Sequence, residues 1–184
     1  SALTFTSANW NSAQTVTVTG ADDNIIDGTQ TSTVTVSIVD ASSDDAFDSV
    51  PDRTVSVATA DNDVAGFTIA QSGGSTSVAE TGTTDTFTVV LNAQPASNVV
   101  LAITSGDTGE ATVTSALTFT SGNWNSAQTV TVTGVDDNLV DGTITSTITV
   151  AVNDGSSDNN FDPVVDQTVS VTTTDNDVTG FTIA

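Results

Sequence analysis

The sequence predicts an all-β protein built from tandem antiparallel β-sandwich modules. Residues 1–70 align without a gap to residues 115–184, with 52 of 70 positions identical, so the chain repeats with a period of 114 residues. That period is too long for one turn of a solenoid and suits one whole domain. Within each period, short runs of alternating Thr and Val or Ile are separated by turn residues, and none has helical periodicity.

One full period, residues 64–177, is expected to contain a series of short strands. We expect these strands at residues 66–70, 75–79, 84–92, 98–104, 110–114, 117–120, 126–133, 143–152 and 167–174. The strand at 75–79 is expected to continue the strand at 66–70 after a break at Gly73 and Gly74. A module of this size can bury a core and should fold as a unit.

The two ends of the chain are expected to be parts of further modules. Residues 1–63 correspond to the C-terminal half of one module, and residues 178–184 to the first strand of the next. A half sandwich would expose the inward faces of six valines: Val16, Val18, Val34, Val36, Val55 and Val57. We therefore expect the chain to be a window on a longer repetitive polymer, or to be completed by a neighbouring copy.

An acidic loop lies between two strands of each repeat. Residues 134–142 hold Asp136, Asp137 and Asp141 between two glycines, and residues 20–28 repeat the arrangement. Carboxylates held this close repel one another unless a cation lies among them. Calcium prefers hard oxygen ligands in a flexible loop that a glycine helps to turn. The loop therefore predicts a calcium site.

Composition excludes several classes of function. The chain has 23 acidic residues, only two of them Glu, against the single base Arg53, and its net charge is −22. This charge argues against binding nucleic acid or anionic membranes. Since His, Cys, Lys, Tyr and Met are missing, Ser-His-Asp and Cys-His nucleophiles, lysine bases, and thiolate or imidazole sites for zinc are excluded. A pair of carboxylates for acid/base catalysis is formally possible, but no aromatic-lined cleft accompanies the acids, and we expect no enzyme.

The motifs of the full period together resemble the Calx-beta domain, a calcium-binding, immunoglobulin-like sandwich. These motifs are Val78-Ala79-Glu80, Leu117-Thr118-Phe119, Asp136-Asp137 with Asp141, and Asp175-Asn176-Asp177. The resemblance implies side-chain ligands for Ca²⁺ at Glu80, Glu110, Asp136, Asp137, Asp141, Asp175 and Asp177, with the backbone carbonyl of Leu139. It implies the same positions of the first repeat: Asp22, Asp23, Ile25, Asp27, Asp61 and Asp63. Ile144 stands where the family often has a further acid, so we expect fewer ions than its most heavily loaded members hold.

Other residues have competing interpretations. Asp107, Asp154 and Asp175 could each form a simple Asx turn. Asp158 and Asp162 are expected at the other end of the sandwich, as turn formers around a packed Phe161, with a second metal site as the alternative. Trp124 and its copy Trp10 could cap the core, contact a preceding module, or offer a platform to a carbohydrate.

Two functions of different classes fit these observations. In the first, the protein is a calcium-stabilised stiff spacer in a bacterial extracellular adhesin, surface layer or filament, and its partners are neighbouring copies of the same module. In the second, it is a calcium-sensing or ligand-binding module. Nearly identical copies favour the spacer, because each copy adds length whereas a sensor gains little from repetition.

Overall fold

The structure is a computed structural model that describes residues 2–183, and these fall into two compact units. The first unit contains residues 2–23 and 29–60, and the second contains residues 24–28 and 61–183. The five residues 24–28 come from the acidic loop of the first repeat but are part of the second unit. A search of the described residues found no helix with the length and apolarity of a membrane span.

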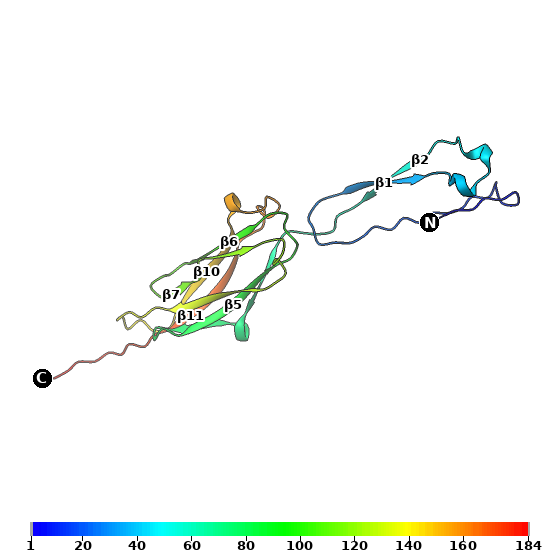
Figure 1. Ribbon diagram of the computed structural model, residues 1–184. Helices are drawn as coiled ribbons and strands as arrows, with labels where there is room; N and C mark the ends of the chain where they lie inside the picture. Colours follow the sequence, from blue (N-terminus) through cyan, green and yellow to red (C-terminus); the bar gives the residue numbers. More distant parts are fainter. Residues whose placement is uncertain (1, 184) are drawn as a thin grey trace. The chain divides into compact units, whose positions relative to one another are not determined.

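The first unit contains one antiparallel pair of strands. β1 (Gln30–Val36) pairs with β2 (Arg53–Thr59), with Val34 opposite Val55, and Figure 1 shows the two strands side by side. The connection between the two strands contains two short 3₁₀ helices, η1 (Asp40–Ser42) and η2 (Asp45–Phe47). Of the six valines expected to be exposed, Val16, Val18, Val36 and Val55 are exposed, and Val34 and Val57 are half-buried.

The segment before β1 contains no strand in the described part of the first unit. Residues 117–120 and 126–133 form strands in the second unit, where they pair with strands from the first half of that module. Their equivalents, residues 3–6 and 12–19, pair with no strand in the part of the first unit that the structure describes. A strand needs a neighbour to satisfy its backbone donors and acceptors, which explains why residues 3–6 and 12–19 form no strand although they repeat the sequence pattern of residues 117–120 and 126–133.

The second unit is a sandwich of two sheets. The first sheet has the order β4-β11-β10-β6-β8 and the second has the order β3-β5-β9-β7. The strands are β3 (Phe67–Gln71), β4 (Thr76–Ala79), β5 (Thr84–Leu91), β6 (Val99–Ser105), β7 (Ala111–Val113), β8 (Ala116–Phe119), β9 (Gln128–Gly134), β10 (Ile144–Val152) and β11 (Gln167–Thr174). Two 3₁₀ helices, η3 (Ser72–Gly74) and η4 (Asp154–Ser156), complete the unit. The all-β prediction is confirmed, and the strands match the expected ranges to within two residues at each end.

The core lies between the two sheets and follows from the alternation of the strands. In β9, Val130 and Val132 are fully buried while the intervening Thr131 is exposed. Phe87, Phe119 and Phe161 are the largest fully buried side chains. The core therefore joins both sheets and the loop between β10 and β11.

One feature of the expected topology is wrong. Residues 75–79 do not extend the first strand, because β3 pairs with β5 in one sheet whereas β4 pairs with β11 in the other. Gly73 (φ 62°) and Gly74 (φ 84°) adopt the left-handed conformation that turns the chain between the sheets. The β4–β11 pair is also parallel, so the sandwich is antiparallel except at this edge.

Candidate metal centre

Glu80 is brought to the acidic loop by a close approach of two backbones. Glu80 follows β4, and its amide donates to the carbonyl of Thr174 at 3.1 Å. Gly134, the last residue of β9, lies so close to Ala79 that a Cβ placed on it would be 2.1 Å from the Ala79 carbonyl oxygen. Only glycine fits there without a shift of backbone. The acidic loop therefore starts directly beside Glu80.

Glu110 lies at the same end, just before β7. Its carbonyl accepts a hydrogen bond from the amide of Val135 at 2.8 Å and one from the hydroxyl of Thr173 at 3.4 Å. Ala111, the next residue, pairs with Gly134 in the sheet. Glu110 is thus held against both the acidic loop and the end of β11.

The end of β11 fastens the far side of the acidic loop. One carboxylate oxygen of Asp175 accepts a bond from the amide of Gly142 at 2.8 Å, and the other accepts from the amide of Asp177 at 2.6 Å. Gly142 has φ 80°, a conformation that favours glycine. Within the loop, the amide of Leu139 donates to Asp137 at 2.6 Å. These hydrogen bonds therefore fix the backbone of the acidic loop and of the segment after β11.

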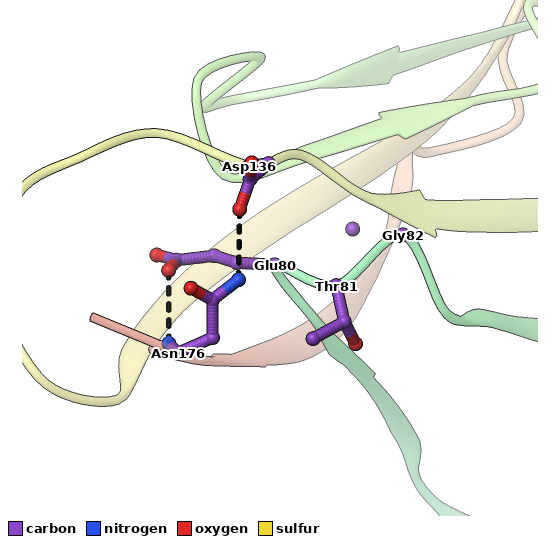
Figure 2. A pocket seen from close by; sticks show the side chains of 6 residues that line it. Glu80, Thr81, Gly82, Asp136 and Asn176 are labelled. Carbon is purple, nitrogen blue, oxygen red and sulfur yellow. Dashed lines mark hydrogen bonds between the residues drawn. The ribbon is translucent and has the colours of Figure 1, made fainter. Parts of the chain in front are cut away.

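Asn176 links two of the acids and was not singled out as a site residue from the sequence. Its amide donates to Glu80 Oε2 at 3.1 Å, and its side-chain nitrogen donates to Asp136 Oδ1 at 2.7 Å. Figure 2 shows Asn176 between these two carboxylates, in an open cleft that Thr81 and Gly82 also line. The sequence signal was its place between Asp175 and Asp177.

Six carboxylates from four segments of the chain converge in three overlapping groups. In each group, one oxygen of every member lies within 4.8 Å of one oxygen of the others: Glu80, Asp137 and Asp177; Glu80, Asp141 and Asp175; Glu110, Asp137 and Asp141. Since Glu80, Asp137 and Asp141 each belong to two groups, the three groups join into one cluster of carboxylates. Asp136 is in none of them and is engaged by Asn176 instead.

Three of these carboxylates each have one buried oxygen without a hydrogen-bond partner in the described chain. Glu80 is only 1% exposed and Glu110 only 6%. Within the described chain, Glu80 Oε1, Glu110 Oε2 and Asp177 Oδ2 are buried and accept no hydrogen bond. Burying an ionised carboxylate is costly unless it is paired. Because residues 61–184 contain no Lys, Arg or His, no side chain of this repeat can supply the positive charge.

Burial and mutual repulsion raise the pKa values of Glu80, Glu110 and Asp177. The pKa of Glu110 is raised, first by burial and then by the charge of Asp141. The pKa of Asp177 is raised by burial and by Asp175. For Glu80, the hydrogen bond from the Asn176 amide pulls the pKa down, but burial and repulsion from neighbouring carboxylates outweigh it, and the pKa is raised. The site thus disfavours its own ionised state.

Asp175 behaves differently from its neighbours. Hydrogen bonds from the amides of Gly142 and Asp177 lower its pKa. The Asx-turn interpretation therefore describes its contact with Asp177 correctly, and Asp175 also belongs to one of the three carboxylate groups. Asp107 forms such a turn as well, since its carboxylate accepts the amide of Gly109 at 3.0 Å.

The acids of the first repeat are arranged in part like those of the second. Asp61 accepts hydrogen bonds from the amides of Asp27 at 3.0 Å, Gly28 at 2.8 Å and Asp63 at 2.8 Å, and its pKa is lowered by these bonds, that from Asp63 first. Ile25 forms an isolated β-bridge within the second unit. The remaining predicted ligands, Asp22 and Asp23, belong to the first unit. The three carboxylate groups found in the described chain all come from the second repeat.

Asp158 acts as a turn former at the opposite end of the sandwich. One of its oxygens accepts the amides of Ala96 at 2.7 Å and Ser97 at 2.9 Å, and the other accepts the amide of Asn160 at 3.0 Å. These bonds lower its pKa against the opposing effect of burial. Phe161, the neighbour of Asn160, is fully buried, so the turn interpretation is confirmed for Asp158.

Trp124 packs against the core, in agreement with its expected capping role. It is partly buried against the core residues, and its carbonyl accepts the amide of Leu91 at 3.1 Å. Its copy Trp10, in the first unit, is 71% exposed.

No protein-family model and no curated protein matches the chain. Among solved structures, it is similar to domains 4 and 5 of the S-layer protein SbsC, with 26% identity, a TM-score of 0.46, and coverage of 79% of this chain and 58% of that one. It is also similar to the apo-form Calx CBD1 domain, with 16% identity, a TM-score of 0.42, and coverage of 60% of this chain and 98% of that one. The chain spans 17% of the length of a larger SbsC structure, domains 1–6, at 25% identity and a TM-score of 0.46. These are similarities of structure.

Proposed function

We propose that the repeat is a calcium-stabilised structural module of an extracellular bacterial surface protein, in which successive copies form a stiff spacer. The observation that carries the proposal is the convergence of six carboxylates with three buried oxygens that lack a partner. A cation that enters such a cluster would stabilise it, because the repeat has no basic side chain to pair with the acids.

The donor set fits Ca²⁺ better than other common metals. All side-chain ligands are carboxylates, and hard oxygen donors select Ca²⁺, Mg²⁺ or Mn²⁺ over zinc or copper. Shared carboxylates from four segments of chain suit the large, irregular coordination shell of Ca²⁺, whereas Mg²⁺ demands octahedral geometry and keeps several waters. Glu80, Glu110, Asp137, Asp141, Asp175 and Asp177 would hold the ion, with Asp136 and the Leu139 carbonyl as further candidates.

A structural role is favoured over catalysis. The acids lie at the end of a packed sandwich and are fixed by backbone hydrogen bonds from Gly142, Asp177 and Asn176. The ion would therefore join the β4, β9 and β11 ends of one module. We propose that the module is not an enzyme, and that its partners are neighbouring copies of itself.

The test is a calcium titration of the chelator-stripped chain by calorimetry, followed by thermal unfolding. A structural extracellular module is expected to bind with a dissociation constant of about 0.1–1 mM, and a sensor with about 0.1–10 µM. At roughly 100 times the dissociation constant, calcium should stabilise the second unit by about 2.7 kcal/mol. Micromolar binding would favour the sensor, and an unfolding curve that is identical in calcium and in excess chelator would refute the calcium role.

A further inference from the structure

The acidic-loop segment 24–28 of the first repeat is seated on the second unit. The Asn24 carbonyl accepts the amide of Gln94 at 2.7 Å, and the side-chain nitrogen of Asn160 donates to the Ile26 carbonyl at 3.1 Å. Ile26 is half-buried and packs against the core of the second unit. The segment is therefore held by both hydrogen bonds and apolar contact.

The surface that receives this segment is chemically suited to an acidic loop. Gln94 and Asn160 are uncharged and present N–H donors to the loop carbonyls. The Gln94 side chain is itself fixed, since its nitrogen donates to the Ser121 carbonyl at 3.0 Å. Donors without a carboxylate of their own avoid repulsion from a loop that carries several.

The same segment of the second repeat has no such cover in the described chain. Leu139 and Val140, the equivalents of Ile25 and Ile26, are 63% and 54% exposed, whereas Ile25 is 38% exposed and Ile26 is half-buried. Two adjacent apolar side chains at the tip of an acidic loop are unusual for a purely solvated turn.

The uncovered loop is closed by the same hydrogen bond as the seated one. The amide of Gly142 donates to Asp175 at 2.8 Å, as the amide of Gly28 donates to Asp61 at 2.8 Å. Both glycines have positive φ, 80° and 68°. The second loop therefore needs little rearrangement to bind in the same way.

The connection after the loop is repeated too. Residues 61–70 and 175–184 differ at a single position, Ala65 against Thr179. The second unit also carries its acidic loop at one end and its receiving surface at the other, beside the turn that holds Trp124. A segment at one end of a module that binds a surface at the other end of the next copy makes a head-to-tail interface.

We propose that Leu139 and Val140 form a docking segment for a further copy of this module, which seats them on its own equivalents of Gln94 and Asn160. The inference rests on the proposed role of the module as a repeat in an array. It does not rest on calcium, because the contacts are made by apolar side chains and backbone carbonyls.

The first half of the test uses the contact that segment 24–28 makes with the second unit. Changing Ile25 and Ile26 to Asp in the full chain is expected to speed hydrogen exchange of the Gln94 amide about threefold to tenfold, as expected for the loss of one half-buried Ile. The amides of β9 should keep their protection, which shows that the sandwich is still folded. Unchanged protection of Gln94 would overturn the assignment of the contact.

The second half tests the docking segment itself. The full chain is extended after Ala184 by another copy of residues 71–184, with only the added copy isotope-labelled. Its equivalent of the Gln94 amide is expected to exchange as slowly as Gln94 does. Changing Leu139 and Val140 to Asp should remove that protection, and a second pair, Leu139→Ser with Val140→Ser, should do the same.

The outcomes separate this inference from the calcium proposal. Fast exchange in the extended chain, or slow exchange that survives both pairs of substitutions, would overturn the docking segment. Docking that persists in a chain showing no heat of calcium binding leaves the segment standing and refutes calcium. Calcium binding with an unprotected amide does the reverse.

Discussion

Replacing Gly134 by alanine is expected to destabilise the second unit and to displace Glu80. The new Cβ would lie 2.1 Å from the carbonyl oxygen of Ala79 and 2.7 Å from its carbonyl carbon. Both atoms are backbone, and Ala79 is held by its pairing with Thr174 and by a hydrogen bond from the Gly82 amide at 3.1 Å. The end of β4 must therefore move, and Glu80 moves with it.

The size of the effect follows from the severity of the overlap. Overpacking costs about 1–3 kcal/mol, and a clash between backbone atoms belongs in the upper part of that range. For a domain of this size, the melting temperature should fall by roughly 8–12 °C. Trp124 fluorescence can follow the transition, because Trp124 is partly buried while Trp10 is already 71% exposed.

Gly155→Ala is the matched control for this substitution. The nearest atom to a Cβ at Gly155 is a side-chain oxygen of Asn153 at 4.0 Å, so the change should stay within about 0.5 kcal/mol. Calcium affinity should fall for Gly134→Ala and stay constant for Gly155→Ala. Equal melting temperatures and equal affinities for the two variants would refute this account of the site.

The remaining predictions concern the carboxylates. Changing Asp136 and Asp137 together to Asn should weaken calcium binding strongly in calorimetry and leave the fold intact at high calcium. Asp162→Asn should leave the calcium affinity unchanged. Equal losses of affinity in the two variants would show that the calcium site has been assigned to the wrong end of the sandwich. In chelator, the second unit should become less stable as pH rises from about 4.5, the ordinary pKa of Glu, towards neutrality. The reason is that the raised pKa values of Glu80 and Glu110 make the folded state bind protons more tightly than the unfolded state. The melting temperature in chelator should therefore fall as pH rises across this range, and it should fall less steeply for Glu80→Gln. A melting temperature that rises with pH would contradict the burial of uncompensated charge.

The strands of the second unit were predictable because each alternates cleanly and pairs within the same module. Val130 and Val132 in β9 are buried as the pattern requires. In the first repeat the same pattern forms β1 and β2 but no strand at residues 3–6 or 12–19, since local alternation does not supply a partner. The transfer of β4 to the opposite sheet was missed because Gly73 and Gly74 mark a break without giving its direction.

The candidate site was predictable in its acids and less so in what positions them. Glu80 and Glu110 stand out as the only glutamates, and both lie in the cluster. The roles of Gly134 and Asn176 depend on distances between segments far apart in sequence, so no local pattern reveals them. Asp136 was expected among the ligands, and the structure gives it a hydrogen bond from Asn176.

The parallel pairing of β4 with β11 has a mechanical consequence for a chain under tension. β4 lies near the start of the module and β11 at its end, and they share the register from Thr76 opposite Val171 to Ala79 opposite Thr174. Tension applied to the two ends of the module reaches β4 through β3, and once β3 has separated from β5 it pulls β4 and β11 in opposite directions along their common axis. The interstrand hydrogen bonds are then loaded together in shear and cannot be peeled apart one at a time.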